Sequence, residues 1–128
     1  NIADYHFLII AYDLTETNIK SFEKLNLFAQ KCAADSISVV CITGSTPSEV
    51  DKFSKKVSPK FPVYSADPTA LKTIIRSNPG ILLLRNGYII DKWSHRKIIS
   101  YETFISKKKD FDIAYEKYTS AKTVSKPE

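Results

Sequence analysis

Cysteine and histidine are the side chains of this sequence that most readily do chemistry, and each type occurs twice. Cys32 falls at the end of an apolar helical stripe and Cys41 within an apolar strand pattern, so both are predicted to be buried. A buried free thiol behaves as a small hydrophobe, and the spacing of these two matches no redox or zinc-binding pattern. We predict that neither thiol is reactive, because reactivity requires exposure and an electropositive neighbour.

Neither histidine has the companions that a metal site needs. His6 precedes the first predicted strand and His95 follows Trp93, with no further ligand type at metal-binding spacing near either one. Asp13 ends a predicted buried strand and is expected to cap or turn the chain. The sequence therefore predicts no catalytic residue, no metal and no cofactor.

The chain carries a formal net charge of +5, with lysines and arginines spread over residues 52–60, 96–97 and 107–109. We interpret these charges as solvated faces, which favour solubility and weak attraction to anionic surfaces. No recognised nucleic-acid-binding module is present, so no specific nucleic-acid partner is expected. A general anion- or nucleic-acid-binding domain stays open as an alternative, and its affinity would fall steeply with salt.

Length and hydropathy predict one domain over residues 1–118, followed by a polar tail without periodicity over residues 119–128. No apolar run approaches the length that crosses a bilayer, so we expect membrane contact only through a segment outside this sequence. The sequence has no methionine and opens at Asn1 without a charged-then-apolar leader, which is compatible with a signal or membrane segment upstream.

The elements that must position any site are predicted in the order strand, helix, strand. Residues 7–12 form a continuous apolar run typical of a central strand. Capping side chains at 15–18 open a helix that ends near Ala34, and residues 38–43 form the next buried strand. This order predicts a parallel pair of strands with a right-handed crossover.

Three further helices are expected. Residues 46–49 form a capping box that opens the second helix, and Asp67 with Pro68 caps a short third one. Between these two helices, residues 61–64 suit only an edge strand. Ser100 is predicted to cap a last helix that carries an apolar stripe through Phe111, with Tyr115 and Tyr118 as candidates to extend it.

A β-hairpin is the strongest local signal. Asn86 and Gly87 supply the two positive φ angles of a type I′ turn, so residues 81–85 should pair antiparallel with residues 88–93. Pro79 cannot donate to a sheet ladder and is expected at the entrance of the first of these strands.

The stretch over residues 75–87, Ile-Arg-Ser-Asn-Pro-Gly-Ile-Leu-Leu-Leu-Arg-Asn-Gly, resembles the thioredoxin pattern Ile-Arg-x-x-Pro-x-Leu-Leu-Leu-x-Lys-Asn-Gly. The resemblance implies an α/β class, thioredoxin-like three-layer α/β/α fold. Its mixed central sheet would have about four to five strands, with a C-terminal β-hairpin and a terminal helix. It also implies a cis bond between Asn78 and Pro79.

The other half of the thioredoxin signature is missing, because Cys-x-x-Cys would fall on Glu16 and Ile19. The helix between the second strand and the hairpin is more like the TlpA and peroxiredoxin-type branch than like small thioredoxins. Residues 67–80 and the pair Lys92-Trp93 are in turn similar to the soluble domain of DoxX-family membrane proteins of Bacteroidetes. That similarity implies a soluble domain of a bacterial inner-membrane protein on the periplasmic side.

The resemblance also implies a candidate peptide-binding groove where the start of the first helix meets the proline. A partner strand could be added there without any thiol. The residues of this candidate groove are Thr15, Glu16, Thr17, Asn18, Asn78 and Pro79. We therefore expect no enzyme but a redox-inactive accessory or interaction domain with a protein or peptide partner. The alternative is a thiol oxidoreductase or peroxidase-type enzyme that uses Cys32 or Cys41.

Overall fold

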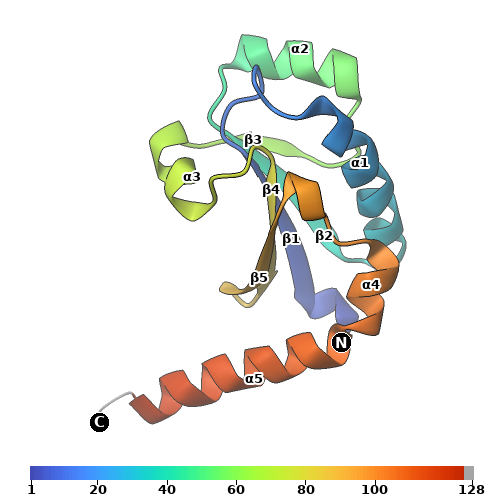
Figure 1. The fold of residues 1–128 in the computed structure, drawn as a ribbon. Helices are drawn as coiled ribbons and strands as arrows, with labels where there is room; N and C mark the ends of the chain where they lie inside the picture. Colours follow the sequence, from blue (N-terminus) through green and yellow to red (C-terminus); the bar gives the residue numbers. More distant parts are fainter. Residues whose placement is uncertain (126–128) are drawn as a thin grey trace.

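The computed structural model describes the backbone of residues 1–125 and the side chains of residues 1–120, and it shows one mixed sheet with helices on both faces. The strands lie in the order β3-β2-β1-β4-β5, so that β1 is central, as the apolar run predicted (Figure 1). Their bounds are β1 Tyr5–Ala11, β2 Ser38–Thr43, β3 Val63–Ser65, β4 Gly80–Arg85 and β5 Tyr88–Ser94. β1, β2 and β3 are mutually parallel, whereas β4 and β5 run antiparallel to their neighbours.

Capping side chains explain where the helices begin. Asn18 accepts from the Ser21 amide, Thr46 and Glu49 form a reciprocal capping box, and Asp67 and Ser100 cap the two short helices. The helices are α1 Ile19–Ala34, α2 Pro47–Val57, α3 Pro68–Ile74, α4 Tyr101–Ser106 and α5 Lys108–Ser125, with 3₁₀ turns η1 Ile2–Asp4 and η2 His95–Lys97. The starts of α1, α2, α3 and α4 agree with the sequence prediction.

The two faces of the sheet are covered unequally. The larger core packs α1, α2, α4 and the start of α5 against one face, and its aromatic side chains meet edge to face, with the ring centroids of Phe7 and Phe28 4.7 Å apart. The other face is covered by α3, where Leu71 packs with Ile10 and Leu82. Figure 1 shows α3 on the opposite side of the sheet from α1 and α4. The sheet is therefore a middle layer, as predicted.

The hairpin has the predicted turn. Asn86 and Gly87 adopt φ angles of 48° and 80°, and β4 pairs antiparallel with β5 on either side of them. One feature was not predicted: the register shifts between Leu83 and Leu84, which marks a β-bulge in β5.

The end of the chain differs from the single last helix that the sequence predicted. Lys107 leaves the helical path, with φ −99° and ψ 5°, and divides the segment into α4 and α5. The α5 backbone continues across the predicted boundary between residues 118 and 119 and ends at Ser125. Residues 126–128 of the predicted tail lie outside the described part of the chain. Among the helices of residues 1–125, none is both long and apolar enough to cross a membrane.

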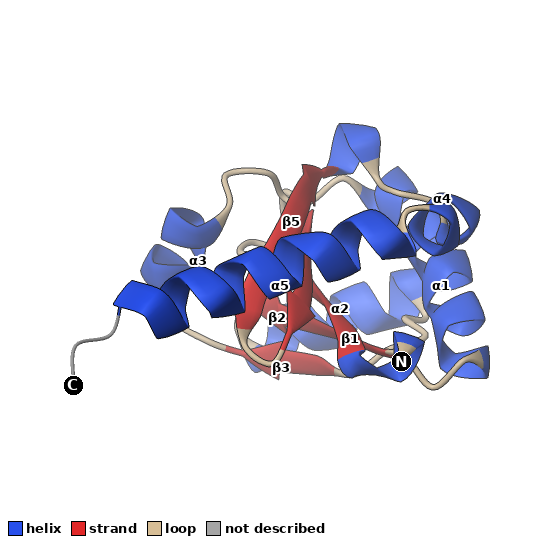
Figure 2. Cartoon of the chain, turned by 90° about the horizontal axis from the view of Figure 1, so that it is seen from below, coloured by secondary structure: helices blue, strands red, loops and turns tan. Residues whose placement is uncertain are grey.

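Asp112 attaches α5 to the hairpin end of the sheet. It accepts hydrogen bonds from the Tyr5 hydroxyl, from Arg85 at 3.2 Å and from Lys108 at 2.8 Å. Burial opposes ionisation of this carboxyl, but the bonds from Lys108 and Tyr5 and the neighbouring positive charges outweigh it and lower its pKa. The Arg85 guanidinium also lies 4.2 Å from the ring centroid of Tyr115. Figure 2 shows α5 passing across the sheet as seen from below.

Candidate functional site

The loop between β1 and α1 meets the segment before β4, as the resemblance implied. The Asn18 amide donates to the Asn78 carbonyl at 3.1 Å, and the Asn78 side-chain amide donates to the Asp13 carbonyl at 2.7 Å. The Asn78–Pro79 bond is cis, which confirms that expectation. These contacts define the loop end of the sheet, formed by residues 13–18 and 78–79, opposite the hairpin end.

The six residues of the candidate groove are brought together but not equally presented. Thr15, Glu16 and Asn18 are exposed and Asn78 is half-buried, whereas Thr17 and Pro79 are buried. Four of the six can therefore touch a partner directly. Their role in binding a peptide stays a prediction.

Asp13 shapes the loop as expected. Its carboxylate accepts from the Thr15 amide at 2.9 Å and from the Thr15 hydroxyl at 2.6 Å, and this closes a tight turn. The next amide, from Leu14, donates to the Ser45 hydroxyl at 2.8 Å and so ties the loop to the end of β2. The loop is thus fixed by short polar contacts to β2 and to Asn78.

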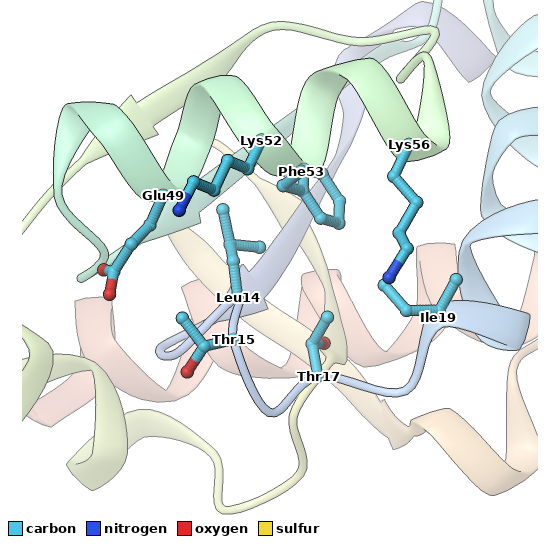
Figure 3. A pocket seen from close by; sticks show the side chains of 8 residues that line it. All are labelled: Leu14, Thr15, Thr17, Ile19, Glu49, Lys52, Phe53 and Lys56. Atoms are coloured by element: carbon cyan, nitrogen blue, oxygen red, sulfur yellow. The ribbon is translucent and has the colours of Figure 1, made fainter.

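Concave surfaces flank this loop on two sides. On one side, a pocket opens between the loop and α2, with Leu14 and Phe53 at its apolar base and Lys52 and Lys56 on its α2 side (Figure 3). We call it the α2 pocket. On the other side, a shallow groove runs between the loop and α3, which we call the α3 groove.

The α3 groove is rich in charge. Lys72, Arg76 and Lys92 line it together with the acids Asp13 and Glu16. Sequence reasoning did not single out the three basic residues. A signal was present, since Lys72 and Arg76 stand four positions apart directly before the Asn78-Pro79 pair.

Two buried polar atoms at the loop end have no hydrogen-bond partner within the described residues: the Thr17 hydroxyl and the side-chain oxygen of Asn78. Buried polar groups nearly always have a hydrogen-bond partner, so each of these two atoms is an exception that needs an explanation. Both lie in the segments that the resemblance selected.

The two thiols lie outside the loop, one on α1 and one in β2. Cys32 and Cys41 are free and fully buried. Burial raises the pKa of each thiol to about 12, with the charge of Asp35 adding to the effect at Cys32. Residues 13–25 contain no cysteine. No thiol would therefore fall at the start of α1 even if the alignment with the thioredoxin motif were shifted by a few residues.

The histidines contribute no metal site in the described part of the chain. Within residues 1–125 no group of three or more histidine, cysteine or acidic side chains is placed to hold a metal ion. His95 instead lines a shallow hollow beside the start of α1, together with Asn18 and Arg96.

No family model matches this chain, and no curated protein matches it. Solved structures do share its architecture. StoA from Bacillus subtilis superposes with a TM-score of 0.61 at 18% identity, covering 81% of this chain and 81% of that chain. A Chlorobium tepidum protein named after the thiol:disulfide interchange protein DsbE gives 0.60 at 19% identity, covering 70% and 67%.

A mutant of peroxiredoxin Q from Xanthomonas campestris is similar over 90% of this chain and 79% of its own length, with a TM-score of 0.51 at 15% identity. At such identities the likeness shows the fold and nothing finer. The chain has a thioredoxin-like fold, as the pattern around Pro79 implied.

Proposed function

We propose that this chain is a redox-inactive interaction domain that binds an extended segment of a protein partner at the loop end. One observation carries the proposal: the loop keeps its contact with the cis Asn78–Pro79 segment, while no cysteine lies near the start of α1. A thioredoxin-like fold without that thiol has no nucleophile for disulfide exchange, but its backbone can still be recognised.

The geometry limits how a partner can bind. The Asn78 carbonyl already accepts from Asn18, so a partner strand would compete with that bond or use the carbonyl's second lone pair. Arg76, an exposed residue whose carbonyl accepts from the Tyr12 hydroxyl at 3.3 Å, lies next to this segment along the α3 groove. With three basic residues against two acidic ones, this groove favours an acidic or neutral partner segment.

A turnover assay tests the redox part of the proposal. We expect insulin reduction and peroxide consumption to stay at the uncatalysed rate in the presence of dithiothreitol. Turnover at normal enzymatic rates would contradict the proposal. Loss of that turnover in a variant with both cysteines replaced by serine would then support a thiol oxidoreductase.

A peptide titration tests the binding part. The probes are two matched series of blocked, extended Val- and Thr-based peptides, one carrying Glu and the other Lys. NMR shifts of the ¹⁵N-labelled chain should cluster at Asn18 and residues 76–78, and the Glu series should bind more tightly. Arg76→Glu should reverse that preference, whereas Lys117→Glu on α5 should leave it unchanged. Scattered or absent shifts with both series would contradict peptide binding at the loop end.

The cellular setting belongs to the same proposal. The similarity of residues 67–80 and of Lys92-Trp93 to the soluble domain of DoxX-family proteins supports an accessory domain of a bacterial inner-membrane protein on the periplasmic side. Sequencing the full-length gene product and fusing an alkaline phosphatase reporter to this domain tests both points. An upstream set of membrane spans and an active reporter are the expected results.

A further inference from the structure

We infer that the uncovered part of the sheet face beside α3 binds an amphipathic, acidic helix of a partner protein. The larger core fills one face of the sheet, whereas α3 packs over the loop half of the other face. In Figure 1 the rest of that face lies between α3 and the far end of α5. We call it the open face, and its apolar side chains are Leu8, Val40, Tyr64, Leu84 and Ile89. It is distinct from the loop end, so binding here does not depend on the proposed function.

Strand alternation places these side chains on the side of α3. Neighbours along a strand point to opposite faces of a sheet. The residues directly before the first four belong to the larger core or pack against it: Phe7, Val39, Val63 and Leu83. Ile89 joins the open face because it is paired with Leu84 across the hairpin. All five strands therefore contribute to one apolar surface.

The open face still has apolar surface to bury. On the loop half, Leu71 of α3 packs with Ile10 and Leu82, and all three are buried. On the open face, Val40 and Leu84 are half-buried, whereas Ile89 and Tyr64 are 46% and 57% exposed. Covering these side chains would remove further apolar surface from water, as α3 does for its half.

The size of the open face suits one helix. It extends about 20 Å across the five strands and about 10 Å along them. An α-helix is about 10–12 Å wide with its side chains, and about 14 residues of helix are about 20 Å long. A second copy of the chain packed flat on this surface would bury only about 200 Å² of each partner, against about 800 Å² in a standard interface. The dimensions therefore favour a helix over a second copy.

The charges around the open face favour an acidic partner. Lys92 lies opposite Leu82 and so points to the side of α3. Its ammonium contacts the Ile74 carbonyl at 3.4 Å, and Lys72 of α3 lies 5.3 Å from the ring centroid of Tyr12. Neither α3 nor the strand residues on this side include an acid. Glutamates beside the apolar stripe of a partner helix would be attracted, whereas a second copy of a chain with net charge +5 would be repelled.

A titration with designed helices tests the inference. The probe is a blocked peptide of about 16 residues of Leu, Ala and Glu, with the leucines in one helical stripe. We expect saturable NMR shifts at Leu8, Val40, Leu84 and Ile89. A scrambled peptide of the same composition, and the same helix with Lys in place of Glu, should each bind at least about fivefold more weakly. No saturable shift with the probe, or equal affinity for the scrambled peptide, would overturn the inference.

Substitutions locate the contact. Ile89→Glu puts an acid into the open face and should weaken binding of the probe by at least about tenfold. Ile113→Glu on α5 is the matched control, because Ile113 is 49% exposed, and it should leave the affinity unchanged. Lys92→Gln should weaken binding by about two- to fivefold. Equal losses at Ile89 and Ile113 would overturn the inference, since they would show a general charge effect. Should Ile89→Glu fail to fold, Tyr64→Ser on the edge strand replaces it, with an expected loss of about fivefold.

Sedimentation of the free chain tests the second copy as the occupant. We expect a monomer at every concentration used in the titration. A dimer that shifts the signals of Val40 and Ile89, and that Ile89→Glu abolishes, would assign the open face to a second copy and overturn the inference. The expected shifts lie in strand residues away from Asn18 and residues 76–78. They are therefore distinguishable from those of a peptide bound at the loop end.

Discussion

The two ends of the sheet are built from different interactions. At the loop end, residues 13–18 and 78–79 are joined by neutral hydrogen bonds, mostly to backbone groups. The nearby cations are held by weak contacts: Lys92 donates to the Ile74 carbonyl at 3.4 Å, and the Lys72 ammonium lies 5.3 Å from the ring centroid of Tyr12. At the hairpin end, Tyr5, Arg85 and Lys108 converge on Asp112, and two aromatic rings flank the guanidinium. The loop end keeps buried polar atoms without hydrogen-bond partners among the described residues, whereas most charged groups at the hairpin end are paired.

This difference indicates where binding and where stability reside. Charged groups that are paired and partly buried hold an element in place, and here that element is α5. Unpaired cations beside concave surfaces, together with buried polar atoms that lack partners, leave room for a ligand. The pairing is not complete at the hairpin end, because the Nε of Arg85 has no partner within the described residues. The contrast is therefore one of degree.

The largest expected effect comes from the two buried thiols, which lie outside the loop end. Cys32 and Cys41 have pKa values raised from 9.0 to about 12. The unfolded chain loses these protons first as pH rises, so stability should fall from about pH 9 upward until the folded pKa is reached. By about pH 10.5 the loss should approach about 2 kcal/mol per thiol.

Urea unfolding at pH 8 and at about pH 10.5 measures this loss. Replacing both cysteines with alanine should lower the stability at pH 8 and flatten its decline with pH. A decline of equal slope in that variant would show that other groups are responsible. Tyr5, whose pKa burial raises to about 12, adds a smaller contribution that begins near pH 10.

The next effect is at the hairpin end. Asp112→Ala leaves the Tyr5 hydroxyl and the Arg85 guanidinium without their shared acceptor, so we expect a loss of about 2 kcal/mol in the free energy of unfolding at pH 7. Asp110→Ala, an exposed acid in the first turn of the same helix, should cost less than about 0.5 kcal/mol. Similar losses in both variants would mean that the network around Asp112 does not hold α5.

The same network has a defined pH dependence. Because the folded pKa of Asp112 is lowered from 3.8, its contribution is fully present above that value and is lost as pH falls through the lowered pKa. The difference in stability between wild type and Asp112→Ala should therefore shrink in acid.

The smallest effect is at the loop end. Asn18→Ala removes the side-chain oxygen that accepts from the Ser21 amide and hydroxyl, each at 3.0 Å, and should cost about 1 kcal/mol. Asn18→Asp keeps the cap and should cost only a few tenths of that amount. Thermal unfolding by circular dichroism is sufficient for the comparison. A cost at Asn18 above that at Asp112 would reverse the contrast between the two ends.

Local patterns in the sequence were enough for most of the fold. The Asn86-Gly87 turn and the Thr46 capping box depend on neighbouring residues alone, so both could be predicted. The break at Lys107 and the bulge near Leu83 could not, because each depends on how distant elements pack. For the same reason Asp112 went unnoticed: Tyr5, one of its partners, lies 107 positions away in the chain.

The candidate site was predicted less completely. The meeting of Asn18 with Asn78 followed from the resemblance, which carries tertiary information that periodicity lacks. The α2 pocket could not be predicted in this way, because the sequence pattern placed its lysines on a solvated face. Only the structure shows that Lys52 and Lys56 line one pocket together with the buried Thr17.

The two edges of the sheet bear on how this chain behaves at high concentration. β3 pairs with β2 over only three residues and is preceded by Pro62, which cannot donate a hydrogen bond. At the opposite edge, β5 carries the exposed pair Asp91 and Lys92 and is bent by the bulge. Short, charged and bulged edges are poor templates for another strand. Self-association through the sheet is thereby disfavoured, and the chain should stay monodisperse under conditions in which flat-edged sheets form fibrils.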